Sequence, residues 1–148
     1  MPILIGVAGP SGAGKSTFCK RAEQEHNEVM RFKFDDFYVS ASEVETHPSG
    51  YQYWDHPSSI KWDELIGALR RLKAGQPAEI PNYSKAQDKM IGAKLVQPAP
   101  AILVDGIQVL WDERLRALLD MSIYFDLNES TQIDRRILRQ PDVNREYL

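Results

Sequence analysis

The chain has 148 residues, 43% of them hydrophobic and 26% charged, and its formal net charge is −3. These proportions are typical of a globular protein and argue against a disordered or fibrous chain, and the length suits one domain with its own hydrophobic core. The slight negative charge gives no general electrostatic attraction to nucleic acid or to an anionic membrane. We therefore expect a single domain that binds neither.

Two features of the sequence indicate the compartment. The single cysteine, Cys19, cannot form a disulfide within the chain. The apolar run at residues 3–8 follows no basic segment and leads directly into glycines, so it is too short for a signal peptide or a membrane span. Both features favour a reduced, cytoplasmic setting.

The first elements expected along the chain are a strand, a loop, a helix and a second strand. Residues 3–8 form a β-branched run that ends in glycine, which is typical of a strand buried on both faces. A glycine-rich loop follows, and residues 15–26 place apolar side chains at helical spacing. Residues 29–34 alternate apolar and charged side chains and lead into Asp35 and Asp36, as a strand with acids at its carboxyl end would.

The middle of the chain is expected to contain one helix between two irregular stretches. Residues 39–59 have little periodicity and many polar, Pro and Gly residues, so we expect a long ordered loop over the site. Residues 60–73 carry a helical apolar stripe, which Gly75 and Pro77 end. A second irregular stretch is expected at residues 79–100.

The last third of the sequence predicts four more elements. Residues 101–106 form a buried apolar strand that ends in an acid, residues 113–119 a short helix, and residues 121–126 another strand. Residues 131–139 are expected to form a basic helix, which Pro141 ends.

Strands and helices thus alternate along the chain, which predicts an α/β fold with a parallel sheet and helices on both of its faces, in three layers, α/β/α. In such sheets, ligands bind beyond the carboxyl ends of the strands. Gly9, Asp35 and Asp105 all fall at such ends. We therefore expect the functional site at this edge.

The loop after the first strand matches the phosphate-loop pattern, in which a glycine, four residues and a Gly-Lys-Ser sequence lie between a strand and a helix. Its glycines let successive N–H groups approach phosphate oxygens, while the helix directs its positive end at the same charge. Lys15 is expected to bridge the β- and γ-phosphates of ATP, and the Ser16 hydroxyl to bind Mg²⁺. The alternative is a plain glycine-rich turn. The predicted nucleotide-binding residues are Gly9, Ser11, Gly12, Ala13, Gly14, Lys15, Ser16 and Thr17.

Acids at two other strand ends are candidates for metal binding and catalysis. Asp105 is expected to hold Mg²⁺ directly or through water, unless Asp105 and Gly106 only form a turn at the end of the strand. Asp35 or Asp36 is expected to accept the proton of an attacking hydroxyl. Because successive strand residues point to opposite sides, we expect one of these two to face the site. The alternative for this pair is a cap of a helix or turn.

A basic group and an aromatic group allow two interpretations each. The arginines of the last predicted helix, Arg135, Arg136 and Arg139, form either a solvated surface or an element that closes over the phosphates and neutralises their charge. The aromatic residues next to Asp55 in the first long loop either bind a sugar and the ring attached to it or simply pack the loop. These are Tyr51, Tyr53, Trp54 and His56.

Taken in order, these motifs resemble the phosphoribulokinase and uridine kinase family of P-loop kinases. The resemblance extends over residues 3–139, and the ordered set of motifs is far more specific than the first motif alone. The set consists of GPSGAGKST at residues 9–17, DDFY at 35–38, YWDHP at 53–57, LKAGQP at 72–77, IPNY at 80–83, LVDGI at 103–107 and DERLR at 112–116. It implies an α/β fold of the P-loop NTPase type.

The resemblance also implies roles for individual residues. Asp35 corresponds to the base near the acceptor hydroxyl, and Asp105 matches a position that is usually glutamate, so its shorter side chain is expected to act on Mg²⁺ through water. The catalytic residues implied are Lys15, Asp35, Arg136 and Arg139. The residues implied around the substrate are Asp35, Tyr38, Asp55, His56, Tyr83 and Arg136. Those implied near the metal are Ser16, Asp35 and Asp105.

The sequence departs from the family pattern in two places. Uridine kinases have an Asp-Phe pair and a histidine after the tyrosine that matches Tyr83, where this chain has Ser84, Lys85 and Asp88. The chain also ends at Leu148, before the rest of the lid and the final strand and helix of the family. We therefore expect residues 1–148 to form a single P-loop kinase domain without the C-terminal part of the family fold.

The function expected from these features is an ATP- and Mg²⁺-dependent kinase that phosphorylates a hydroxyl of a small metabolite, with a nucleoside favoured by the resemblance. Acceptors like those of phosphoribulokinase, pantothenate kinase or nicotinamide riboside kinase remain open, as does a homo-oligomer. An inactive nucleotide-binding protein is the alternative from another class. A GTPase is disfavoured because the sequence has no Asn-Lys-x-Asp segment to bind guanine.

Overall fold

The computed structural model describes residues 1–10, 12–46, 48–50, 56–84, 87, 89–126 and 131. The strands of this part are β1 (Ile3–Ala8), β2 (Val29–Lys33), β3 (Ala78–Ser84), β4 (Lys89–Val96), β5 (Ala101–Asp105) and β6 (Met121–Tyr124). Its α-helices are α1 (Lys15–Glu25), α2 (Trp62–Lys73) and α3 (Glu113–Leu118). Three short 3-10 helices are η1 (Phe34–Phe37), η2 (Ala41–Glu43) and η3 (Pro57–Ser59).

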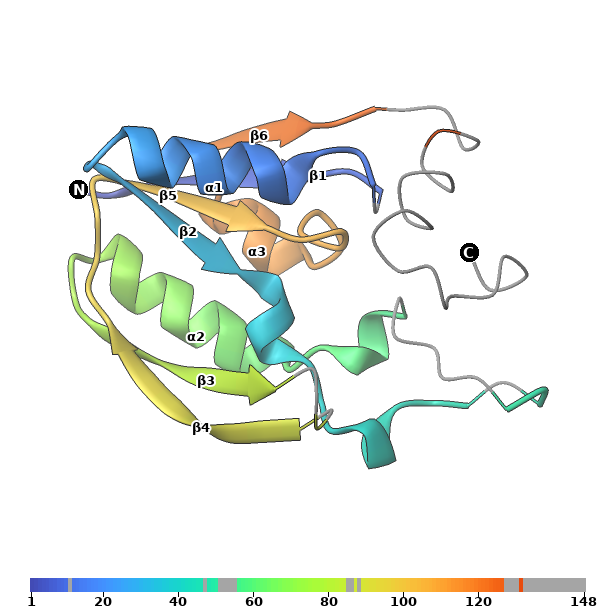
Figure 1. Cartoon of the computed structure of the whole chain (residues 1–148). Helices are drawn as coiled ribbons and strands as arrows, with labels where there is room; N and C mark the ends of the chain where they lie inside the picture. Colours follow the sequence, from blue (N-terminus) through green and yellow to red (C-terminus); the bar gives the residue numbers. More distant parts are fainter. Residues whose placement is uncertain are drawn as a thin grey trace.

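The central sheet has the strand order β2-β5-β1-β6, and all of its pairs are parallel. Helix α1 covers one face, whereas α2 and α3 lie on the other, so the molecule has three layers (Figure 1). This arrangement confirms the predicted three-layer α/β/α fold with a parallel sheet. A separate antiparallel hairpin of β3 and β4 packs beside α2 and η1.

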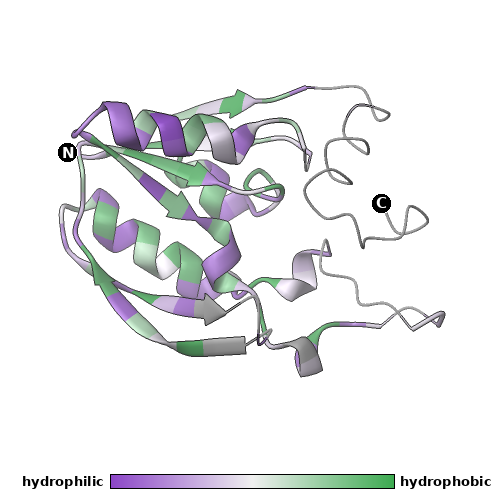
Figure 2. Cartoon of the chain, in the orientation of Figure 1, coloured by the Kyte–Doolittle hydropathy of each residue, from purple (hydrophilic) through white to green (hydrophobic). Residues whose placement is uncertain are grey.

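Coverage on both faces explains why β1 is a nearly continuous apolar run. Leu4 and Ala8 belong to the large cluster on the α2 and α3 side, whereas Val7 belongs to a small cluster with Cys19 of α1. A strand buried on both faces has no polar side to alternate with. Figure 2 shows that β5 is similar, because hydrophobic colour covers most of this strand, whereas the helices have mixed colours.

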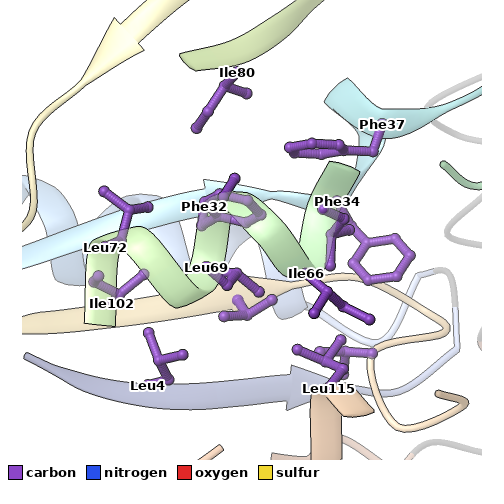
Figure 3. Close-up of a cluster of buried hydrophobic side chains, with 14 of the residues drawn as sticks. Leu4, Phe32, Phe34, Phe37, Ile66, Leu69, Leu72, Ile80, Ile102 and Leu115 are labelled. Atoms are coloured by element: carbon purple, nitrogen blue, oxygen red, sulfur yellow. The ribbon is translucent and has the colours of Figure 1, made fainter. Parts of the chain in front are cut away.

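The larger cluster is the main core of the molecule. Helix α2 contributes Leu65, Ile66, Leu69 and Leu72, which the helical repeat places on one stripe. Burial of each such side chain contributes about 1.5–3 kcal/mol. Figure 3 shows this stripe facing side chains from the sheet, from η1, from β3 and from α3, which include Leu4, Phe32, Phe34, Phe37, Ile80, Ile102 and Leu115.

Helix α2 ends at Lys73, and Gly75 stops it as the sequence predicts. This glycine has a φ of 79°, and its N–H donates to the carbonyl of Leu72 at 3.0 Å. The N–H of Gln76 reaches back to the carbonyl of Arg71 at 2.9 Å. These two bonds form a Schellman motif, which requires a left-handed residue after the helix and so favours glycine.

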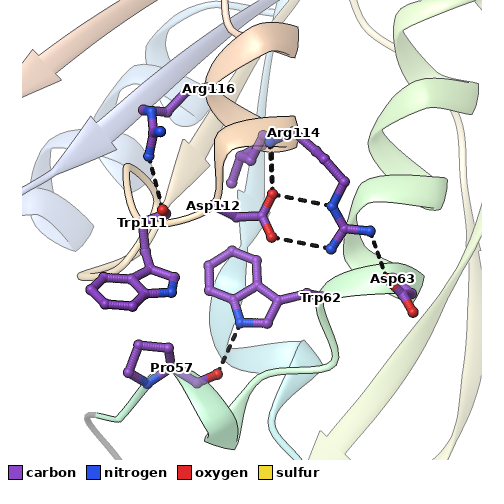
Figure 4. A network of polar contacts seen from close by, with 8 residues as sticks. Pro57, Trp62, Asp63, Trp111, Asp112, Arg114 and Arg116 are labelled. Atoms are coloured by element: carbon purple, nitrogen blue, oxygen red, sulfur yellow. Dashed lines mark hydrogen bonds and ion pairs between the residues drawn. The ribbon is translucent and has the colours of Figure 1, made fainter.

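The polar contacts in Figure 4 connect the starts of α2 and α3. Asp112 caps α3 by accepting from the N–H groups of Arg114 at 2.8 Å and Leu115 at 3.4 Å. The guanidinium of Arg114 contacts both Asp112 and Asp63 of α2. The hydrogen bonds from Arg114 lower the pKa of Asp112 below its ordinary value of 3.8.

The prediction of an irregular stretch at residues 79–100 is wrong, because this region contains the β3–β4 hairpin. Its alternation is hidden by Pro81, which lies opposite Ala93 next to an irregularity in the register, and by Gly92 in β4. Proline and glycine weaken a strand pattern in sequence, yet both are tolerated at edges and bulges. The hairpin is stabilised by the burial of Ala78 and Ile80 against the main core.

The prediction that Asp35 and Asp36 alternate on a strand is also wrong. Strand β2 ends at Lys33, and both acids lie in η1. Phe34 and Phe37 are buried on the core side of this turn. Their burial bends the chain into a 3-10 turn, because both rings enter the core and a straight strand would place them on opposite faces.

The long stretch at residues 39–59 is fixed at its base. Tyr38 and Ile60 form an isolated antiparallel bridge, and the N–H of Val39 donates to the carbonyl of Ser59 at 2.8 Å. Two short 3-10 helices, η2 and η3, lie within it. The basic helix predicted at residues 131–139 lies outside the described residues except for residue 131. Within the described part, no helix has the length and apolar character needed to cross a membrane.

Candidate active site

Three strands bring the predicted site residues to one edge of the sheet. Val7 and Lys33 are both in register with Asp105, so β1, β2 and β5 end side by side. The phosphate loop, η1 and the turn at Gly106 continue from these three ends, on the same side of the sheet (Figure 1). The parallel register therefore places Gly9, Asp35 and the Asp105 carboxylate at one edge, as the sequence predicts.

The phosphate loop has the backbone that its glycines permit. Gly9, Gly12 and Gly14 have φ values of 139°, 84° and 98°, which residues other than glycine rarely adopt. A Cβ atom at Gly9 would also lie 2.5 Å from the carbonyl oxygen of Phe125, the residue that follows β6. The loop can therefore turn tightly and direct backbone N–H groups at an anion. Ser11 lies outside the described residues.

Helix α1 begins directly after this loop, at Lys15. The Lys15 side chain is buried, and its Nζ donates to the carbonyl of Pro10 at 3.2 Å, so the ammonium lies over the loop. Ser16 is half-buried and Thr17 is exposed. The first turn contains no acid that would compete for the positive end of the helix. The segment is therefore suited to bind the phosphates of a nucleotide.

Asp105 forms a buried ion pair with Arg31 of β2. The Nε and Nη2 atoms of Arg31 lie 2.9 and 2.8 Å from the same oxygen, Oδ2. The two side chains are only 13% and 4% exposed. Within the described part of the chain, no hydrogen bond reaches the other oxygen, Oδ1. Arg31 thus contacts one of the two oxygens of the Asp105 carboxylate.

The donor set at this edge fits Mg²⁺. This ion prefers oxygen ligands and is usually held by one or two carboxylates together with phosphate oxygens and water. Oδ1 of Asp105 and the hydroxyl of Ser16, beside the phosphate loop, are donors of this kind. The role predicted for Asp35 near the metal stays a prediction.

Cys19 lies one turn after Lys15, on the helix side that faces the sheet. Its side chain is fully buried. Burial, with a smaller contribution from the negative charge of Asp105, raises the pKa of the thiol to about 12, against the lowering influence of Arg31 and Lys15. The thiol is therefore neutral and forms part of the packing under the loop.

The two acids of η1 differ in their surroundings. Asp35 is half-buried, whereas Asp36 is buried and its Oδ2 lies 3.4 Å from Nζ of Lys94 in β4. The start of η1 is packed tightly, since a Cβ atom at Gly106 would lie 2.5 Å from Cβ of Phe34. Asp36 is thus held by the hairpin, and Asp35 is the acid that remains partly accessible at the edge.

The segment that begins with η3 is fastened beside η1. The N–H of Lys61 donates to the carbonyl of Phe37 at 2.8 Å, next to the Tyr38–Ile60 bridge. His56, predicted to contact the substrate, is exposed, and its Nδ1 accepts from the N–H of Ser58 at 3.1 Å, which caps η3. The backbone thus fixes η3, which contains the end of the YWDHP motif, beside the segment that follows η1.

Several predicted site residues cannot be placed. Tyr83 lies on β3, but its side chain is outside the described part, and four other predicted residues lie outside it altogether: Ser11, Asp55, Arg136 and Arg139. Their roles stay predictions.

The sequence profile of the phosphoribulokinase and uridine kinase family matches residues 4–145. The chain belongs to this family. The matched region contains the phosphate loop, the acids after β2 and at the end of β5, and the β3–β4 hairpin.

Individual relatives agree with this membership. The chain is 36% identical over 141 residues to a uridine kinase of Halalkalibacterium halodurans, covering 93% of this chain and 67% of that protein. It is 33% identical over 141 residues to uridine kinase-like protein 5 of Arabidopsis thaliana, covering 93% of this chain and 30% of the relative. The chain therefore spans only part of the length of the relatives it matches.

A solved structure supports the fold. The structure described as a possible uridine kinase from Bacillus stearothermophilus matches with a TM-score of 0.72 and 21% identity, covering 95% of this chain and 79% of that one. At this identity the likeness supports the family fold and does not extend to the substrate.

Two contributors to this edge were missed by the sequence interpretation, Arg31 and Lys94. Both lie in segments where charged and apolar residues are mixed, and such charges normally face solvent. In the structure each instead contacts a buried acid, Asp105 or Asp36. Only the tertiary structure could reveal these contacts, because the partners are 74 and 58 residues apart in sequence.

Proposed function

We propose that the chain is an ATP-dependent kinase domain that transfers the γ-phosphate to a hydroxyl of a small metabolite. The observation that carries this proposal is the meeting of the phosphate loop, Asp35 and Asp105 at one edge of the parallel sheet. Membership of the phosphoribulokinase and uridine kinase family supports it. The cofactors proposed are ATP and Mg²⁺.

The chemistry required of the protein is mainly positioning and charge neutralisation, because the transferred phosphoryl group needs little covalent help. The loop N–H groups and Lys15 hold the phosphates, and the ammonium offsets their charge. Asp35 orients the acceptor hydroxyl and accepts its proton. Ser16, together with Asp105 directly or through water, would hold Mg²⁺, which would supply charge neutralisation on the phosphates. Arg136 and Arg139 are proposed to close over the same charge.

A nucleoside is the acceptor that we favour, because relatives of the chain are named uridine kinase and uridine kinase-like protein. Tyr38, Asp55, His56 and Tyr83 are proposed to bind it. The departures from the uridine kinase pattern at Ser84, Lys85 and Asp88 point to a changed contact with the base. Sugar phosphates, pantothenate and nicotinamide riboside are therefore the acceptors to test beside uridine and cytidine.

The test is a screen of ATP consumption with Mg²⁺ against these acceptors, followed by Asp35→Asn. We expect turnover with at least one acceptor. Loss of the carboxylate base should lower kcat by roughly 10²–10⁴-fold, while ATP binding measured by calorimetry stays near that of the unchanged protein.

Asp63→Asn is the matched control, because Asp63 is 90% exposed at the start of α2 and lies outside the proposed site. It should leave kcat unchanged. ATP binding without turnover on any acceptor would reject the kinase and favour a nucleotide-binding protein without catalysis. A fall of less than about threefold for Asp35→Asn would remove Asp35 from the role of base.

A further inference from the structure

Arg31 forms a buried ion pair with Asp105, but the proposed function gives Arg31 no role. Arg31 is in register with Leu103, two residues before Asp105, and both lie on the α1 face of the sheet. Its side chain must therefore run along the sheet toward the carboxyl edge to reach the acid. Both contacting nitrogens meet Oδ2, at 2.9 and 2.8 Å.

The surroundings of the pair are apolar except at the phosphate loop. Val7, Leu103 and Cys19 form the small cluster under α1, and each is at most 4% exposed. A lone carboxylate is costly in such a place, so it requires a partner. An arginine that served only to neutralise Asp105 would gain most from a two-oxygen contact. In this structure it engages one oxygen and leaves Oδ1 without a hydrogen bond from any described residue.

The pair also belongs electrostatically to the phosphate site. The pKa of Cys19 is influenced by Asp105, Arg31 and Lys15, and also by Glu23 of α1, so the ion pair and the lysine of the phosphate loop act on the same buried thiol. Because Arg31 contacts Asp105, the negative charge of this carboxylate is already partly compensated before a nucleotide enters the loop.

We propose that Arg31 is a positioning residue for Asp105: by holding Oδ2, it keeps Oδ1 turned toward the Mg²⁺ and phosphates of the bound nucleotide. Arg31 does not touch the nucleotide and acts through the carboxylate. This inference rests on the proposed function, because it assigns Arg31 to the same nucleotide site. Outer partners of this kind typically change metal affinity by roughly 10- to 100-fold when they are removed.

The experiment measures the Mg²⁺ dependence of nucleotide binding and requires no turnover. Calorimetric titrations with adenylyl imidodiphosphate, over a series of Mg²⁺ concentrations, give the Mg²⁺ concentration at half-maximal nucleotide affinity. Arg31→Met should raise this concentration by about tenfold or more. Arg31→Lys keeps the charge but lacks the two-nitrogen contact, so it should raise it by about threefold or more.

The control and the second variant separate this role from a purely structural one. Arg21→Met makes the same change at a 76% exposed position of α1 and should leave the Mg²⁺ dependence unchanged. In an Asp105→Asn background, Arg31→Met should cause no further change, because Arg31 acts through Asp105. Circular dichroism establishes which variants are folded, and if Arg31→Met unfolds, Arg31→Lys decides alone.

Two outcomes would overturn the inference. If the unchanged protein binds the nucleotide with Mg²⁺ and the folded Arg31 variants keep its Mg²⁺ dependence within twofold, the pair is structural only and the proposed function stands. If the unchanged protein binds no nucleotide, the proposed function fails and the role of Arg31 fails with it.

Discussion

Cys19 illustrates how single residues of α1 are governed by opposing effects. It lies near the start of a helix, close to Lys15 and Arg31, and such positive surroundings usually lower the pKa of a thiol. Full burial outweighs them and raises the pKa to about 12. The residue therefore behaves as a small apolar group under the phosphate loop, although its position resembles that of a reactive cysteine.

This burial predicts an unreactive thiol in the native protein. At mildly alkaline pH, Cys19 should react with iodoacetamide at least about 100-fold more slowly in the folded chain than in urea, because the thiolate fraction falls tenfold for each unit that the pKa rises. Mass spectrometry of the alkylated chain measures both rates. A native rate within tenfold of the unfolded rate would contradict the burial of this side chain.

At the scale of elements, the hairpin and η1 depend on each other. Strand β3 packs against η1, and Ile80 and Phe37 enter the same core. Ile80 and Lys94 are opposite each other in the hairpin, so Lys94 lies on its inner face, from which it reaches Asp36. The hairpin thus supports the turn that carries Asp35.

Lys94→Met should therefore weaken the support of η1. The Lys94 side chain is 45% exposed, so solvent screens its attraction to Asp36. The pair therefore contributes at most about 1 kcal/mol to the free energy of unfolding. Urea denaturation of Lys94→Met, Asp36→Asn and the double variant measures this coupling. An additive double variant would show that Lys94 and Asp36 do not interact. Lys20→Met, at an exposed position of α1, is the control.

The cap of α3 gives a prediction about pH. Asp112→Ala should lower the free energy of unfolding by about 1 kcal/mol near neutral pH, because two N–H groups at the start of the helix lose their acceptor. The pKa of Asp112 is lowered in the folded state, so its charged form stabilises the fold above the ordinary value of 3.8. This contribution is lost as the pH falls through the lowered folded-state pKa.

Urea denaturation over a pH series checks this prediction. The difference between the unchanged protein and Asp112→Ala should be constant at neutral pH and decrease at acidic pH. Asp112→Asn retains an acceptor without the charge, so it should be near the unchanged protein at neutral pH and lack the acid dependence. A difference that is the same at neutral and acidic pH would show that the charge of Asp112 has no part in the cap.

At the scale of the whole molecule, the amino and carboxyl edges of the sheet differ in the contacts that they make. At the amino edge, Oδ2 of Asp120 accepts from the N–H of Leu4 at 2.8 Å, and the carboxylate also pairs with Lys73 at the end of α2. These contacts join three elements far apart in sequence. At the carboxyl edge, the strands instead lead into the phosphate loop, η1 and the turn at Gly106, and in parallel sheets this is the edge at which ligands bind.

Much of this arrangement could be predicted because it depends on local pattern. The phosphate loop, the stripe of α2 with its end at Gly75, and the apolar runs of β1 and β5 are each determined by the periodicity or conformational preference of neighbouring residues. The parallel sheet follows from the alternation of these elements, and the meeting of Gly9, Asp35 and Asp105 follows from the sheet. These predictions are confirmed by the structure.

The sequence by itself therefore determined the family, the three-layer fold and the edge at which the site lies, because each rests on short segments with their own physical preference. Only the tertiary structure decided which charges at that edge are paired. The partners of Asp105 and Asp36 come from other strands, and η1 bends because Phe34 and Phe37 enter one core. Such contacts depend on strand register and on packing between distant segments, which no local pattern encodes.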